Sequence, residues 1–209
     1  MRRDRTSSFR PQPGIRYRVD GTIRAAMKGR AQLKSTQIHV AGPDTTELIA
    51  RFEMLRRHRR RFHLTRSELL EVARWKLEGQ YGRAERHLGR LTAPMVRTVT
   101  AAAFAIDGPD DDLETELRAS LLTLLPGVGL PIASAVLTLV EPKRYAVIDF
   151  RAWRALFGSD RASFGIADYR RFMAALRTQA VIERTTPRAV ELRLWYEDRD
   201  RHGRTPKAG

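Results

Sequence analysis

Two features of residues 113–157 are suited to chemistry: a glycine-rich turn between two apolar segments, and an aspartate about twenty residues after that turn. The turn, residues 125–129, reads Leu-Pro-Gly-Val-Gly. Its glycines lack side chains, so the backbone can adopt conformations closed to other residues and its N–H groups stay accessible. A helix beginning directly after Gly129 would add its own free N–H groups and the positive end of its dipole. The pattern therefore predicts a turn that binds phosphate.

Asp149 lies at the start of a further predicted helix, in the run Val-Ile-Asp-Phe-Arg at residues 147–151. A carboxylate near the anomeric carbon of a sugar stabilises an oxocarbenium-like transition state and can orient or deprotonate an attacking water. Aspartate is also among the best residues for capping a helix N-terminus. A capping aspartate can still present one oxygen to a cleft, so the sequence predicts both roles for Asp149.

The turn, the apolar helix after it and the spacing to Asp149 together resemble the helix-hairpin-helix DNA glycosylase superfamily, HhH-GPD. The resemblance covers residues 113–157 by motif and about 45–195 by the order of helices. It implies an all-α fold, double-stranded DNA as the partner, base flipping, and Asp149 as the catalytic aspartate. It also implies a hairpin that holds the DNA backbone, with room for a monovalent cation, formed by Pro126, Gly127, Val128 and Gly129.

Two departures from that family affect the expected chemistry. Members that also cleave the DNA strand carry a lysine nucleophile just after the hairpin or on the helix before it, and these positions here are Pro131 and Ser120. The histidine common two residues after the aspartate is replaced by Arg151, which could pair with a DNA phosphate or with Asp149. The resemblance therefore implies a monofunctional glycosylase of base excision repair, in which water attacks and an uncleaved abasic site remains.

Lys76 is the lysine that could replace the missing nucleophile. The chain has five lysines, at positions 28, 34, 76, 143 and 207, and only Lys76 lies in a predicted apolar helix, where burial can make an amine more nucleophilic. The alternative interpretation places the neighbouring Trp75 in the core while Lys76 extends its amine to water. In that alternative, the Lys76 amine has no catalytic role.

Two other functions fit the same motif. The chain could be a catalytically silent helix-hairpin-helix protein that binds DNA, in which the absent lysine and histidine reflect lost chemistry. It could also be an accessory of a repair or restriction system that docks through the hairpin, although no paired-carboxylate metal motif is present in the sequence. The acidic run at residues 107–112 precedes a predicted helix, so capping explains it better than metal binding.

Composition limits the class of protein. With 209 residues, 42% of them apolar, the chain can bury a core of its own. It has no cysteine, which excludes disulfides and a cysteine-ligated iron–sulfur cluster, and we expect no cofactor. No apolar run reaches the roughly 20 residues that span a bilayer, and no signal peptide opens the chain. We therefore expect a monomer in the cytoplasm, associated with the nucleoid.

Positive charge is concentrated near the N-terminus. The net charge is +15, and the first 66 residues hold 17 Lys and Arg against 5 Asp and Glu, while the rest holds 22 against 19. This distribution favours a polyanionic partner. The predicted helix at residues 43–61 has an arginine-rich face, on which Arg57 and Arg60 are expected to contact DNA phosphates. The alternative is an arginine-rich genome, since 34 of the 39 basic residues are Arg.

Hydrophobic periodicity predicts an all-α domain over residues 43–197. Its helices are expected at residues 43–61, 66–78, 83–90, 93–106 and 111–124, directly after the hairpin, at 150–156 and 167–184, and from 186 onward. Residues 1–42 are predicted to be a loosely ordered basic arm with short strands at 15–19 and 37–40. Residues 198–209 are predicted to be a polar, frayed tail. The expected architecture is compact and two-lobed, with the hairpin near the cleft.

Overall fold

Helices account for the regular structure of this protein, as the sequence predicted. The computed structural model describes residues 43–108 and 110–203, and the structural statements below concern these residues, which contain no strand. All of the described residues belong to one compact unit. The predicted basic arm and its two strands lie outside the described residues. The prediction of a compact all-α fold is confirmed.

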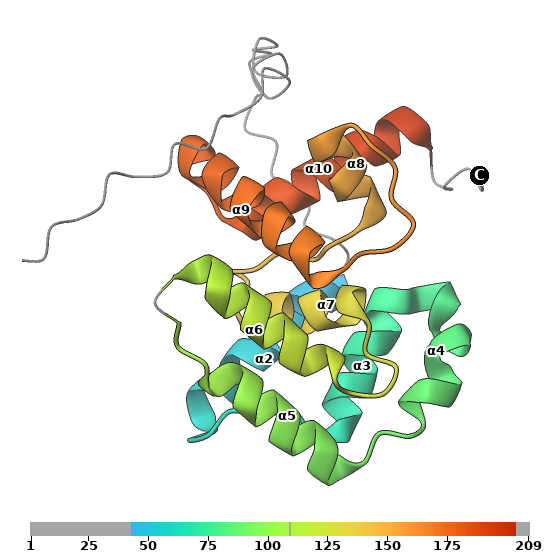
Figure 1. Ribbon diagram of the computed structural model, residues 1–209, viewed down its shortest axis with the longest axis vertical. Coiled ribbons are helices and arrows are strands. Elements are labelled where there is room, and N and C mark those ends of the chain that lie inside the picture. The colour runs from blue at the N-terminus through green and yellow to red at the C-terminus, as the bar shows by residue number, and fades with distance from the viewer. Residues whose placement is uncertain (1–42, 109, 204–209) are drawn as a thin grey trace, which may run out of the picture. The chain divides into compact units, whose positions relative to one another are not determined.

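The helices fall before and after the hairpin turn, with the labels of Figure 1. Before the turn lie α2 (Pro43–His58), α3 (Arg66–Leu77), the short 3-10 helix η2 (Glu78–Gln80), α4 (Tyr81–Leu88), α5 (Ala93–Ala105) and α6 (Asp111–Thr123). After it lie α7 (Leu130–Val140), α8 (Phe150–Phe157), α9 (Ile166–Glu183) and α10 (Pro187–His202). The helix predicted at 83–90 begins earlier, at Tyr81, because η2 leads directly into it.

The helix after the turn, α7, forms the centre of the core. Every residue of α7 except Pro131 is buried. It packs against α2, α3 and α6, and Figure 1 shows it between these helices and the group formed by α8, α9 and α10. A helix that is apolar all round is stable only when protein surrounds it. The expectation of two lobes stays a prediction, since all of the described residues belong to one compact unit.

Side-chain caps fix the helix starts that the sequence indicated. Thr65 and Glu68 form a reciprocal capping box at the start of α3. Asp110 caps α6, where the Leu113 N–H donates to its Oδ1 at 2.6 Å. Such caps satisfy N–H groups that have no partner within the helix. Capping therefore explains part of the acidic run at residues 107–112, as predicted.

The C-terminal helix is longer than the sequence predicted. A frayed tail from Asp198 is wrong for residues 198–202, because α10 continues to His202. Asp198 is 1% exposed and accepts hydrogen bonds from Arg154 Nη2 at 2.7 Å and Arg151 Nη1 at 3.4 Å. Both arginines belong to α8, so a buried, charge-assisted contact joins the last turns of α10 to α8.

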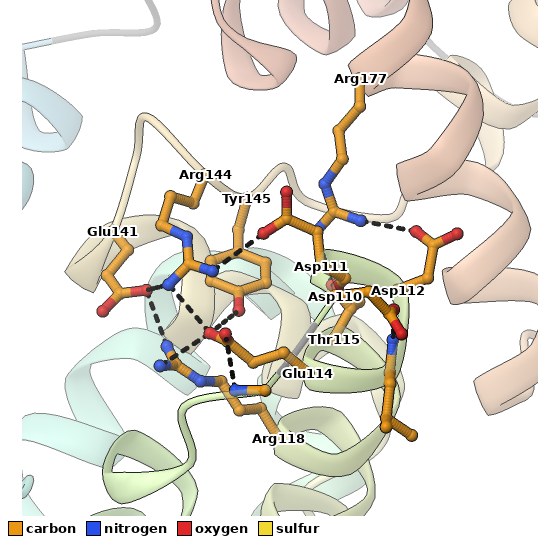
Figure 2. A network of polar contacts seen from close by, with 12 residues as sticks. Asp110, Asp111, Asp112, Glu114, Thr115, Arg118, Glu141, Arg144, Tyr145 and Arg177 are labelled. Atoms are coloured by element: carbon orange, nitrogen blue, oxygen red, sulfur yellow. Dashed lines mark hydrogen bonds and ion pairs between the residues drawn. The ribbon is translucent and has the colours of Figure 1, made fainter. Parts of the chain in front are cut away.

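A group of charged residues joins the first helix of the hairpin to the segment between α7 and α8 (Figure 2). We call it the α6 charge cluster, and it consists of Glu114, Arg118, Glu141, Arg144 and Tyr145. Glu114 Oε1 contacts Arg118 Nη2 at 2.8 Å and Arg144 Nη1 at 2.9 Å. The Tyr145 hydroxyl donates to the same oxygen at 3.1 Å, and Arg118 Nη1 pairs with Glu141 Oε2 at 2.7 Å. The cluster therefore fixes the start of the chain segment that leads to Asp149.

The carboxylate of Glu114 is stabilised in its ionised form by this cluster. Burial favours the neutral form, but the hydrogen bond from Arg144 and the charge of Arg118 outweigh it, so the pKa of Glu114 lies below its ordinary value. Because the folded pKa is lower than the unfolded one, this group adds stability above the unfolded pKa. That stability is lost as the pH falls through the folded pKa.

We expect Glu114→Gln to lower the free energy of unfolding by about 3 kcal/mol at neutral pH, because the buried guanidinium of Arg118 loses one of its two carboxylate partners. The loss should shrink as the pH falls below ~4.5, where the carboxyl takes up its proton in the unfolded chain, and should vanish below the lower pKa of the folded protein. Urea unfolding at several pH values measures both effects. Glu116→Gln is the control, since Glu116 is more exposed and pairs with Arg170 at the surface. Equal losses in the two variants would contradict a special role for the cluster.

Candidate functional site

The turn between α6 and α7 leaves backbone N–H groups without protein partners. Leu125 and Val128 are buried, and the Val128 N–H donates to the Leu125 carbonyl at 3.0 Å. These two side chains attach the turn to the core. The N–H groups of Gly127, Gly129 and Leu130 find no acceptor within residues 43–108 and 110–203. An anion at the turn would therefore meet these free donors and the N-terminal end of α7.

Gly127 is required both by the backbone and by the space around it. Its φ is +78°, in the left-handed region that other residues rarely adopt. A Cβ atom at this position would lie 2.9 Å from the backbone nitrogen of Leu88 and 3.0 Å from Cβ of His87, at the end of α4. The C-terminal end of α4 therefore packs directly against the turn at Gly127. Pro126, the preceding residue, is only partly buried.

Asp149 caps α8, and the segment before it is held by two other helices. Its Oδ1 accepts the N–H of the residue two positions on, at 3.0 Å. The Ile148 N–H donates to Ser134 Oγ of α7 at 3.1 Å. The Tyr169 hydroxyl of α9 donates to the Ala146 carbonyl at 3.1 Å. The second helix of the hairpin therefore positions the Asp149 backbone directly.

Lys76 and Asp149 form an ion pair. Lys76 Nζ lies 3.0 Å from Asp149 Oδ2, and the two side chains are only 12% and 17% exposed. The interpretation in which Lys76 extends to water is therefore wrong. Its amine points toward α8, where it pairs with the carboxylate of Asp149, the residue that caps this helix. Trp75 is half-buried and donates its indole N–H to Thr45 Oγ1 at 3.0 Å. Since the pair is largely shielded from solvent, its attraction is stronger than that of a surface pair.

A second carboxylate, Glu191 of α10, lies near this pair. It is 2% exposed and pairs with Arg188 Nη1 one turn earlier. Burial raises the pKa of Glu191, and the negative charge of Asp149 raises it further. The positive charges of Arg188 and Lys76 lower it, but the pKa remains above the ordinary value for a glutamate. Glu191 thus interacts electrostatically with both members of the ion pair. We call Lys76, Asp149, Arg188 and Glu191 the site cluster.

The site cluster is closed in this conformation. One surface hollow of about 420 Å³ is lined by α2 and α3 residues that include Trp75, and another of about 380 Å³ lies beside the ends of α9 and α10. Neither is lined by Lys76 or Asp149. Because both side chains are mostly covered, a substrate group would reach them only after local movement of the surrounding chain.

The arginines predicted to contact DNA differ in exposure: Arg151 is buried, whereas Arg57 and Arg60 are exposed. Arg151 is 3% exposed, and its Nη1 lies 3.4 Å from Asp198 Oδ2. Arg57 and Arg60 are exposed, so both are available to a phosphate. Other arginines of that segment pair within the protein, including Arg59, whose Nη2 lies 2.7 Å from Glu68 Oε1.

Sequence reasoning did not identify Ser134, Arg188 or Glu191. A signal for Glu191 was present, because the buried residues of α10 include Pro187, Glu191, Leu194 and Asp198, which are spaced as one helical stripe. Two carboxylates on a buried stripe indicate charged partners on the facing helices. Ser134 is a hydroxyl residue within an otherwise apolar helix, which indicates a hydrogen-bonding role.

Over residues 43–108 and 110–203, the fold is all-helical, and one helix, α7, joins a glycine turn with free N–H groups to a shielded lysine–carboxylate pair. Such a pair can stabilise a developing cation through its carboxylate, or form a covalent bond through its amine. Within residues 43–108 and 110–203, no helix combines the length and apolar character needed to cross a bilayer. In comparisons with known proteins, no family model, curated protein or solved structure matches this chain.

Proposed function

We propose that the protein is a monofunctional DNA glycosylase, which flips a damaged or modified base out of double-stranded DNA and hydrolyses its N-glycosidic bond. The observation that carries this proposal is the placement of Asp149. Its carboxylate is shielded and paired with Lys76, and the backbone N–H of the preceding residue, Ile148, donates to Ser134 on the helix that follows the glycine turn. One structural unit therefore contains an element suited to phosphate and a group suited to sugar chemistry.

Asp149 acts at the sugar in this proposal. As the bond to the base breaks, positive charge develops on the sugar ring, and a fixed carboxylate beside it lowers the energy of that state. The same oxygen orients the attacking water and takes its proton. The base leaves with the bonding electrons, and the product is an abasic site in an intact strand. The resemblance to helix-hairpin-helix glycosylases of residues 113–157 supports this assignment.

DNA binding is assigned to the hairpin turn and to the basic surface. The free N–H groups of Gly127 and Gly129 would hold a phosphate without reading sequence. Arg57 and Arg60 are exposed and add positive charge near the end of α2. The net charge of +15 favours such binding, which should weaken steeply as salt is raised.

The test of the proposed function is base release from duplexes that each carry one of a panel of damaged or modified bases. Strand breaks are measured with and without alkali treatment. Breaks that require alkali establish a monofunctional glycosylase and identify the base. Salt-sensitive binding to every duplex with release from none would favour a catalytically silent DNA-binding protein or an accessory of a repair or restriction system.

The contact of 3.0 Å between Lys76 and Asp149 supports a second candidate, in which the enzyme also cleaves the strand. Asp149 would take a proton from the Lys76 ammonium, and the amine would then attack the anomeric carbon as the base leaves. The bond between that carbon and the ring oxygen would break next, the ring oxygen taking the proton from Asp149, to leave an imine. Borohydride reduces the resulting imine to a stable protein–DNA adduct.

Under the monofunctional proposal we expect no borohydride-trapped adduct with the wild-type protein, because the Lys76 amine remains paired with Asp149. Denaturing electrophoresis of a labelled duplex measures the adduct. An adduct that disappears in Lys76→Ala and persists in Lys143→Ala would establish the lyase instead. Lys143 is a suitable control because it is exposed and lies outside the site cluster.

A further inference from the structure

The surface hollow beside the ends of α9 and α10 is lined mainly by cations. It has a volume of about 380 Å³, and its charged lining residues are Asp111, Lys143, Arg144, Arg177 and Arg184. Four of these five side chains are positively charged at neutral pH. A concave site of this size suits a small ligand or one group of a larger one. The charge of its wall favours an anion.

Two of the four cations are held in place by carboxylates of α6 (Figure 2). Arg144 Nη2 lies 2.9 Å from Asp111 Oδ1. Arg177 Nη1 lies 2.8 Å from Asp112 Oδ1, and its Nη2 donates to Thr115 Oγ1 at 2.6 Å. The two guanidinium groups come from different parts of the chain, the segment after α7 and the helix α9. Because they are positioned before a ligand arrives, binding loses less side-chain entropy.

The other two cations, Lys143 and Arg184, are exposed, and neither forms an ion pair with a carboxylate of residues 43–108 and 110–203. Arg184 also ends α9 with a φ of +52°, in the left-handed region where glycine is the usual residue. A strained backbone is a reason to look for a function of the residue that adopts it. Here the side chain adds a cation to the wall of the hollow.

One side of the hollow is apolar. Val181 is 79% exposed and lines the hollow together with Ala180 and Pro187. Cations on one side and exposed carbon on the other suit a ligand that carries a charged group on an organic body. This composition distinguishes the hollow from the hairpin turn, which offers backbone N–H groups.

We propose that this hollow binds a phosphate group, with the organic body that carries the phosphate lying against Val181. Phosphate oxygens accept hydrogen bonds from several guanidinium and ammonium groups at once. The site is separate from the hairpin turn, because Asp111 begins α6 and the turn follows its last residue, Thr123, roughly 20 Å away. The proposal does not depend on base excision. The phosphate belongs either to a small ester or to a nucleic-acid strand, and titrations with each separate the two.

The experiment uses the full-length protein with three probes. Calorimetry measures the binding of inorganic phosphate and of phenyl phosphate, and fluorescence anisotropy measures the binding of a DNA duplex. The test variants are Lys143→Gln and Arg184→Gly; the latter removes the charge while giving the left-handed position the residue that suits it. Arg201→Gln is the control, because Arg201 is exposed and lies at the opposite end of α10 from Pro187.

We expect Lys143→Gln and Arg184→Gly each to weaken both small ligands about tenfold, as for the loss of one charge-assisted hydrogen bond, and Arg201→Gln to weaken them less than about twofold. Val181→Ser should weaken phenyl phosphate about threefold and leave inorganic phosphate unchanged, because only the ester has an apolar body. Duplex affinity that falls more in the two test variants than in Arg201→Gln assigns the phosphate to a strand. Unchanged duplex affinity assigns it to a small ester.

The proposal would be overturned if neither the small ligands nor the duplex bound less tightly to Lys143→Gln and Arg184→Gly than to the wild-type protein. It would also be overturned if Arg201→Gln weakened binding as much, since the effect would then come from net charge alone. An unchanged affinity of Val181→Ser for phenyl phosphate would contradict the place given to the organic body. Base release is a separate measurement, so a protein that releases no base contradicts the proposed function and leaves these titrations to decide the role of the hollow.

Discussion

Replacing Asp149 with asparagine should reduce base release about a thousandfold, because the fixed negative charge that stabilises the sugar cation is removed. Asparagine caps helices about as well as aspartate, so α8 should keep its N-terminal cap and the protein its fold. DNA affinity should be unchanged or slightly higher, since one negative charge has been removed. Single-turnover base release and equilibrium binding on the same duplex measure the two effects.

Asp110→Asn provides the matched control for Asp149→Asn. Asp110 also caps a helix, with the Leu113 N–H at 2.6 Å from its Oδ1, but it is exposed and lies at the start of α6. This change should leave base release within about twofold of wild type, because capping is preserved and no site charge is altered. If both variants lost activity equally, the effect would come from capping, and the catalytic role of Asp149 would be contradicted.

Replacing Gly127 with alanine should lower the free energy of unfolding by about 3 kcal/mol, since two independent costs combine. The first is the φ of +78°, which is unfavourable for any residue with a side chain. The second is the new methyl group, which would lie 2.9 Å from the Leu88 backbone nitrogen. Because this atom belongs to the backbone, α4 and the turn must move apart, and DNA affinity should fall as the turn is displaced.

Gly158→Ala separates the two costs. Gly158 has a φ of +68°, but a Cβ atom there has nothing within 4 Å. Its replacement should therefore cost only about 1 kcal/mol, from the backbone term alone, and DNA affinity should not change. Urea unfolding and DNA titration of both variants measure the difference. Equal stability losses would show that the contact with α4 does not constrain the turn.

The hairpin could be predicted from sequence because its signals are local. Two glycines one residue apart, flanked by apolar helices, determine a turn whatever surrounds them. The caps at Thr65 and Asp110 follow from residue type in the same way. The functions attached to these elements remain predictions, since the fold does not test them.

The contact between Lys76 and Asp149 could not be predicted, because it joins residues 73 positions apart. Periodicity shows which face of a helix is buried but not which helix packs on it. Arg151 illustrates the same limit. Its proximity in sequence to Asp149 favoured a role in the site, whereas the fold places its guanidinium against Asp198, 47 positions away. Glu191 joins the site cluster only because α10 packs against α8.

The hydrogen bond from the Ile148 N–H to Ser134 has a consequence for which nucleotide would be attacked. Ser134 lies on the first turns of α7, directly after the glycine turn, and Asp149 follows Ile148. Under the proposed function, the separation between a phosphate bound at the turn and a sugar beside the carboxylate would therefore be set by the single helix α7. In such a glycosylase, only the nucleotide at one fixed distance along the strand from the bound phosphate could react, whatever its base.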